Sequence, residues 1–273
     1  MQTLSKLLFL LFALLYQQVG FAQKGVLQGI ATYKTAAMIN LGGDSTMSPT
    51  QQEMIQQQVR KAMQREYTLS FKNHESNYKQ VESLDRQEAA QAGGVMVRVA
   101  NSSSLTYKNT KKKRYLEGAD LFGKPFLIDD ELESRDWAMT GKTKQIGKYE
   151  CQQATYMTES RMLEVDSESG EPKEIIRQVE VSAWFTMDIP VNHGPDDFWG
   201  LPGLILEVNS GNFTIICTKV VLNPQEAVEI KVPKGGKPIS RAEFAKLREE
   251  KMKEMQQQYN GNGPQRRMIR VGG

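Results

Sequence analysis

Short runs in which apolar and polar residues alternate recur along most of the chain. The clearest are Tyr67–Phe71, Asn77–Val81, Val95–Val99, Tyr149–Thr158 and Glu174–Met187. A period of two is typical of a strand that has one buried face. Because turns join these runs and few helical segments separate them, they predict an antiparallel sheet and not a series of βαβ units.

Two segments of turn composition separate neighbouring runs and predict hairpins. Asp166–Gly170 separates the run Arg161–Val165 from the run that begins at Glu174, and Asn209–Asn212 separates Leu204–Val208 from Phe213–Leu222. The expected fold is therefore mainly β, with a few helices. It is either a single curved antiparallel sheet or a half-open β-barrel, since twisted antiparallel sheets of this size curl.

Two segments carry helical patterns. At 48–66, Ser48 can cap a helix that has Pro49 at its first position, and Met54 begins an apolar stripe at helical spacing. Near the C-terminus, Ser240 can cap a second, very polar helix over Ser240–Tyr259, with Glu243 completing a capping box. We expect a β domain over 23–233 with the first helix inserted, followed by a linker, the second helix and a flexible tail over 234–273.

The first residues indicate export. Lys6 precedes nine apolar residues, Leu7–Leu15, and small residues lead up to Ala22. This is the pattern of a secretory signal with cleavage after Ala22, and the apolar run is too short for a membrane span, which needs about 20 residues. We therefore expect a periplasmic or secreted protein without a transmembrane segment in its mature part.

The charge balance argues against nucleic acid as a partner. The chain carries 35 Lys and Arg against 32 Asp and Glu, a net charge of +3. Nucleic-acid binding usually needs a concentrated basic patch. The basic run Lys111–Arg114 is better explained as a solvated hairpin turn.

The two cysteines, Cys151 and Cys217, both lie in strand-like segments. In an exported chain they permit one disulfide if their strands are neighbours, and two buried thiols otherwise. The sequence leaves both possibilities open.

The most unusual stretch is Asp188–Val208, which contains Gly200-Leu201-Pro202-Gly203-Leu204-Ile205. Leu201–Leu204 suits a type II turn, in which Pro202 fixes φ and Gly203 supplies a positive φ. Large apolar residues beside the turn should hold it against the core.

These six residues resemble the signature of the GLPGLI family, exported proteins found mainly in Bacteroidota. Ser76–Tyr78, Ile146–Ala154, Val181–Val191 and Gly194-Pro195 are similar to other conserved blocks of that family, and the resemblance extends over roughly 25–255. It implies an exported, mainly β protein, often encoded near outer-membrane transport genes. It implies no catalytic residues, because the activity of the family is undetermined.

The residues available for chemistry are few. His193 lies close in sequence to Asp196 and Asp197, and such a set could serve as a general base or ligate a metal. The same residues also suit a turn, and no paired-histidine or CxxC spacing supports a metal site. The sequence therefore favours a non-enzymatic protein without a cofactor. It would bind a hydrophobic ligand, a peptide or an outer-membrane transport partner through the concave side of its sheet and the Ser240–Tyr259 helix. A hydrolase or metal-dependent peptidase centred on His193 is the alternative.

Overall fold

The structure is a computed structural model. It describes residues 26–37, 64–82, 90–92, 95–97, 104–165, 172–211 and 213–260, with a few single residues between 48 and 57. The predicted signal peptide, 1–22, lies outside the described residues, and so does most of the predicted helix over 48–66. The last two residues of that range begin a strand.

The described part is mainly β, as the alternating runs predicted. Its strands are β1 (Gln28–Ala37), β2 (Arg65–Lys72), β3 (Glu75–Gln80), β4 (Ala90–Ala92), β5 (Val95–Val97), β6 (Leu105–Asn109), β7 (Arg114–Leu121), β8 (Lys124–Glu131), β9 (Ala138–Ile146), β10 (Tyr149–Val165), β11 (Pro172–Thr186), β12 (Leu204–Asn209), β13 (Phe213–Leu222) and β14 (Lys237–Ile239). One helix, α3 (Arg241–Asn260), follows them in the described part of the chain.

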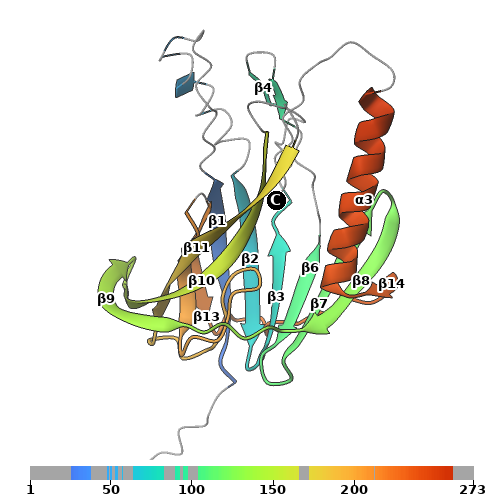
Figure 1. Cartoon of the computed structure of the whole chain (residues 1–273). Helices are drawn as coiled ribbons and strands as arrows, with labels where there is room; N and C mark the ends of the chain where they lie inside the picture. The colour runs from blue at the N-terminus through green and yellow to red at the C-terminus, as the bar shows by residue number, and fades with distance from the viewer. Residues whose placement is uncertain are drawn as a thin grey trace, which may run out of the picture.

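Twelve strands form one sheet in the order β14-β8-β7-β6-β3-β2-β1-β13-β12-β11-β10-β9, and β4 and β5 pair separately. Neighbouring strands of the large sheet are antiparallel except β14, which runs parallel to β8. The sheet curls strongly but stays open, with β14 and β9 at its two edges (Figure 1). The predicted mainly β fold with a C-terminal helix is therefore confirmed.

Both predicted hairpins are present. β10 and β11 pair from Gln152↔Phe185 to Val165↔Pro172, and β12 pairs with β13. The two short runs expected at Tyr149–Thr158 and Arg161–Val165 are one continuous strand, β10. The pairing registers follow the alternation of the sequence, because a slip of one residue would turn the buried side chains outward.

The main core lies on the inner face of the curled sheet. Residues of β1, β2, β3, β10, β11, β12 and β13 contribute to one buried cluster, which includes Tyr33, Leu69, Phe185 and Leu206. The buried Tyr33 hydroxyl donates a hydrogen bond of 2.7 Å to the carbonyl oxygen of Ile205, so a polar group inside this core is satisfied.

The segment that leads to α3 is attached to the sheet. Asn77 of β3 exchanges two hydrogen bonds with the backbone of Lys231, at 2.7 and 2.6 Å. The expected linker includes β14, which extends the sheet beside β8. Within the described residues, no helix combines the length and apolar character needed to cross a membrane.

The predicted capping box fixes the start of α3. Ser240 Oγ donates to Glu243 Oε2 at 2.7 Å, and the Glu243 amide donates to Ser240 Oγ at 3.2 Å. The backbone amide of Arg241 also donates to Asp130 of β8 at 2.9 Å. The first turn of α3 is therefore tied to the sheet beside which the helix stands in Figure 1.

Candidate functional site

The inner face of the sheet packs against residues 188–203, which connect β11 to β12 and are called the motif segment below. Four of its buried side chains belong to the same apolar cluster as those of the strands: Ile189, Val191, Phe198 and Leu201. The buried Trp199 packs in a second cluster, with Tyr115, Ile128 and Leu132. The concave side of the sheet is thus in contact with the chain's own residues.

Lys108 of β6 donates hydrogen bonds to the backbone of the motif segment. Its side chain is fully buried, and its ammonium donates to the carbonyl oxygens of Gly194 at 2.8 Å and Phe198 at 3.3 Å, and to that of Asp196. Burial lowers the pKa of Lys108, and the nearby Asp197 and Asp196 raise it. The three donors of the ammonium thus match three carbonyl oxygens of the motif segment.

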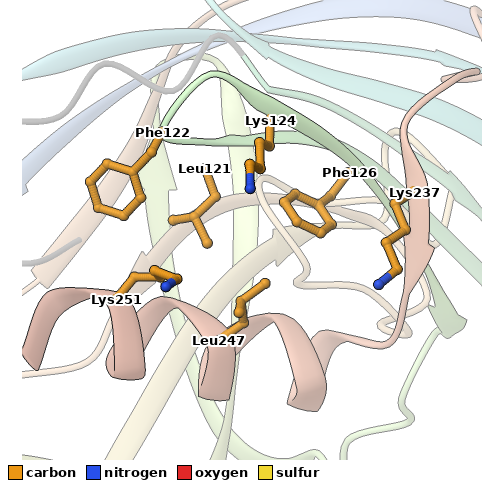
Figure 2. Close-up of a pocket in the computed structure, with 7 residues that line it drawn as sticks. All are labelled: Leu121, Phe122, Lys124, Phe126, Lys237, Leu247 and Lys251. Carbon is orange, nitrogen blue, oxygen red and sulfur yellow. The ribbon is translucent and has the colours of Figure 1, made fainter. Parts of the chain in front are cut away.

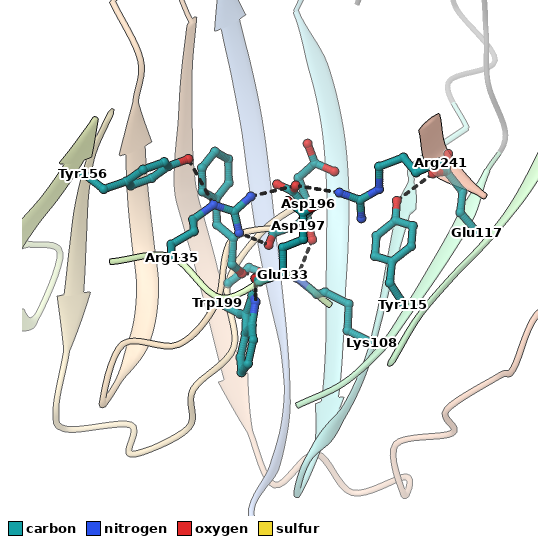
Figure 3. Close-up of polar contacts among 12 residues, drawn as sticks. Lys108, Tyr115, Glu117, Glu133, Arg135, Tyr156, Asp196, Asp197, Trp199 and Arg241 are labelled. Carbon is teal, nitrogen blue, oxygen red and sulfur yellow. Dashed lines mark hydrogen bonds and ion pairs between the residues drawn. The ribbon is translucent and has the colours of Figure 1, made fainter. Parts of the chain in front are cut away.

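The Asp197 carboxylate forms ion pairs with two arginines, as Figure 3 shows. Arg135 lies 2.7 Å from the Asp197 carboxylate and donates to its carbonyl oxygen at 2.6 Å. Arg241, the first residue of α3, approaches the same carboxylate at 3.4 Å. Because Arg135 precedes β9 and Arg241 follows β14, this contact links the two edges of the open sheet to the motif segment.

Aromatic rings hold both arginines in place. The Arg135 guanidinium lies 4.8 Å from the centre of the Phe198 ring and donates to the Tyr156 hydroxyl at 3.0 Å. The Arg241 guanidinium lies 4.0 Å from the centre of the Tyr115 ring. Such stacking restricts a planar guanidinium, so Asp197 meets two oriented donors.

Two tryptophans complete the attachment of the motif segment. Trp199 is buried and donates from Nε1 to the Glu133 carbonyl oxygen at 2.7 Å. Trp137 donates from Nε1 to the Trp199 carbonyl oxygen at 2.9 Å. Both hydrogen bonds fix Trp199, and so they hold the segment two residues after Asp197.

The glycines of the signature act differently from the predicted type II turn. Gly203 has no positive φ, whereas Gly200 has φ +96°. A Cβ added to Gly203 would lie 2.0 Å from the Thr186 carbonyl oxygen and 2.5 Å from its carbon. The prediction for Gly203 was wrong: this position needs glycine because the backbone of β11 passes too close for a side chain.

His193 is a buried core residue. Its side chain has no solvent exposure, Nε2 lies 2.9 Å from the Asn73 carbonyl oxygen, and its ring lies 6.0 Å from that of Phe71. Burial lowers the pKa of His193 to about 4, and the nearby Lys108 and His74 act in the same direction. The imidazole is therefore neutral at neutral pH.

The structure does not bring the predicted catalytic set together. The polar contact of His193 is with the turn at Asn73, while Asp197 is engaged by Arg135 and Arg241. Asp196 is exposed as a residue, with φ +49°. Partial loss of water around its carboxyl and the like charge of Asp197 raise the pKa of that group. In the described part of the chain, no group of three or more His, Cys, Asp and Glu side chains could hold a metal ion.

The burial of His193 predicts a measurable pH dependence. Its pKa of about 4 in the folded state lies below the ordinary value of 6.5, so between these values the unfolded chain binds more protons. The stabilisation is present above pH 6.5 and is lost as pH falls toward 4. Between pH 7 and 4.5, wild type should lose about 2 kcal/mol more free energy of unfolding than His193→Gln.

Urea denaturation at the two pH values measures this difference. His74→Gln is the matched control, because His74 lies exposed in the neighbouring turn. This variant should keep most of the pH dependence of wild type, because burial is the largest cause of the His193 shift. Equal losses for wild type and His193→Gln would contradict a buried, neutral His193.

Cys151 and Cys217 are free thiols in the structure. The disulfide required neighbouring strands, but Cys151 lies on β10 and Cys217 on β13, with β11 and β12 between them in the sheet. Burial raises the pKa of both thiols to about 11, which is typical of unreactive cysteines. Of the two possibilities that the sequence left open, the structure contains the thiols, with Cys151 buried and Cys217 partly buried.

A pocket of about 320 Å³ lies between α3 and the β7–β8 hairpin. Figure 2 shows apolar side chains from both sides facing one another across it, with lysines around them. The lining residues are Leu121, Phe122, Lys124, Phe126, Lys237, Leu247 and Lys251. Phe126 also contacts Phe244 of α3, with ring centres 5.5 Å apart, so one end of the helix is packed while the pocket opens further along it.

The sequence pointed to Asp196 and Asp197 but not to their partners. Arg135 and Arg241 lie 62 and 44 residues from Asp197, and Lys108 lies 86 residues from Gly194. No local spacing signals contacts over such separations. The pocket was missed for the same reason, because its walls come from the β7–β8 hairpin, β14 and α3.

Part of the chain matches a known protein family. Residues 137–207, from just before β9 to β12, match the family described as "Protein of unknown function (Porph_ging)". The matched residues include the motif segment and the Gly200–Ile205 signature. No curated protein matches this sequence.

Two solved structures of PNGF-II, in C2 and P21 space groups, are similar to part of this fold. Their TM-scores are both 0.49, with 12% and 13% sequence identity. The alignments cover 81% of this chain but only 32% and 33% of the solved chains, so this chain spans about a third of their length.

Proposed function

We propose that the chain is an exported GLPGLI-family protein that binds a hydrophobic ligand without catalysing a reaction, in the periplasm or outside the cell. The family match over 137–207, which contains the Gly200–Ile205 signature, supports the membership. The pattern of Lys6 and Leu7–Leu15 supports export. An outer-membrane transport partner, which the family resemblance implies, belongs to the same proposal.

The observation that carries the binding role is the pocket beneath α3. Leu121, Phe126 and Leu247 present apolar walls to a space of about 320 Å³, which falls within the range of small-molecule sites. The apolar walls of an unfilled pocket stay in contact with water, so they contribute no hydrophobic stabilisation to the fold. A ligand that fills this space would remove the walls from water.

The motif segment helps to position α3, which forms one wall of this pocket. Asp197 holds Arg241, and Asp130 accepts from the Arg241 amide, so the first turn of α3 has a fixed position relative to the sheet. The helix can then form one wall of a pocket whose other walls belong to β7, β8 and β14. The same contacts occupy Asp197 structurally, which favours a supporting role over a catalytic one.

A fluorescent apolar probe tests the proposal. Residues 23–273 should enhance and saturate the fluorescence of N-phenyl-1-naphthylamine. Leu247→Gln, which keeps a good helix former, should weaken this binding about tenfold because it removes an apolar wall. The control is Ala245→Gln, at an exposed position of the same helix. Absence of saturable binding by wild type, or equal binding by both variants and wild type, would overturn the proposal.

A further inference from the structure

Three lysines surround the pocket beneath α3 and come from three separate elements. Lys124 begins β8, Lys237 begins β14 and Lys251 lies on α3. Figure 2 shows the ammonium end of Lys124 between Leu121 and Phe126, and that of Lys237 on the other side of Phe126. No carboxylate is among the lining residues of this pocket.

The charges around the pocket are incompletely neutralised. Lys251 pairs with Glu254 at 2.6 Å, whereas no ion pair of Lys124 or Lys237 is found among the described residues. Lys124 and Lys237 are exposed to solvent beside the apolar walls. A bound anion would meet their charges there and gain charge-assisted hydrogen bonds.

We propose that the pocket binds an anionic amphiphile, an aliphatic chain that carries a carboxylate or phosphate head. The inference rests on the proposed binding function and specifies its ligand class. The chain lies against Leu121, Phe126 and Leu247, and the head faces Lys124 and Lys237. A pocket of about 320 Å³ accommodates a chain of roughly ten carbons, since a group the size of a water molecule takes about 30 Å³.

Isothermal titration calorimetry of residues 23–273 with four ligands tests the inference. Decanoate and decyl phosphate carry the two possible heads, decanol has the same chain without charge, and acetate has a charge without the chain. We expect both decyl anions to bind about tenfold or more tightly than decanol, because a hydrogen bond to a charged group contributes more than a neutral one. Acetate should not bind measurably. Comparison of decanoate with decyl phosphate then identifies the preferred head.

The double variant Lys124→Gln/Lys237→Gln should lose about tenfold in affinity for the decyl anions and keep the wild-type affinity for decanol. Lys112→Gln is the control, because Lys112 lies exposed in the β6–β7 turn. Thermal melting of all variants verifies that they fold.

The two levels of the argument fail in different ways. If decanol and the anions bind equally and the double variant changes nothing, the charged-head inference is wrong while the hydrophobic binding site stands. If none of the decyl compounds binds to wild type, the proposed function is overturned together with the inference.

Discussion

Replacement of Gly203 by alanine should cost about 3 kcal/mol or more of the free energy of unfolding. The added methyl would lie 2.0 Å from the Thr186 carbonyl oxygen. That oxygen belongs to the backbone of β11, so it cannot move aside as the end of a flexible side chain could. Relief requires β12 to move away from β11, which would disturb the pairing of Thr186 with Leu204 and the fully buried residues around it. Urea denaturation followed by tryptophan fluorescence measures the loss.

Gly118→Ala is the matched control. Gly118 lies in β7, and the nearest atom to an added Cβ is Pro233 Cβ at 4.0 Å, which is ordinary contact. Alanine there should change stability by less than about 1 kcal/mol. If Gly203→Ala is no more destabilising than Gly118→Ala, the close approach of the two strands is absent in solution.

This glycine shows what a local pattern can and cannot predict. The sequence identified Leu201–Leu204 as a fixed, buried connection, because proline and glycine between large apolar residues restrict the backbone. It assigned the positive φ to Gly203, whereas Gly200 has it and Gly203 instead lies against Thr186. Contact with another strand depends on tertiary structure, which turn statistics do not contain.

Strands with local signals were predicted, whereas a strand without them was missed. The β10–β11 and β12–β13 hairpins were predicted because their alternation and turns are local. Strand β1 was not predicted, although it lies inside the sheet between β2 and β13. Its buried positions hold Gly29, Ala31, Tyr33 and Thr35, while the large aliphatic Ile30 is only partly buried. The apolar alternation that normally marks a strand is therefore missing.

In the candidate site, too, only the contacts between residues close in sequence were predicted. The Ser240–Glu243 capping box was predicted because its partners lie three residues apart. The contacts of Asp197 with Arg135 and Arg241 depend on the curl of the whole sheet, which brings its two edges to one segment. The sequence therefore located the segment but could not assign its partners.

Replacement of Lys108 by methionine should destabilise the protein by about 3 kcal/mol or more. Methionine keeps most of the volume but leaves the carbonyl groups of Gly194, Asp196 and Phe198 without their donor. Each unpaired buried acceptor costs about 1–3 kcal/mol, and partial relaxation or entry of water reduces the total. Denaturation in urea at pH 7 measures the change.

The control for this variant is Lys112→Met, in the exposed turn that follows β6, which should lie within about 0.5 kcal/mol of wild type. If Lys108→Met proved as stable as wild type, the motif segment would not depend on the ammonium. Its position would then follow from the apolar contacts of Phe198 and Leu201 alone. A large loss means that one buried cation, paired with backbone carbonyls and not with a carboxylate, stabilises the turn that presents Asp197 to both arginines. The charged turn would then depend on Lys108 for its shape and on Arg135 and Arg241 for its attachment to the two edges of the sheet.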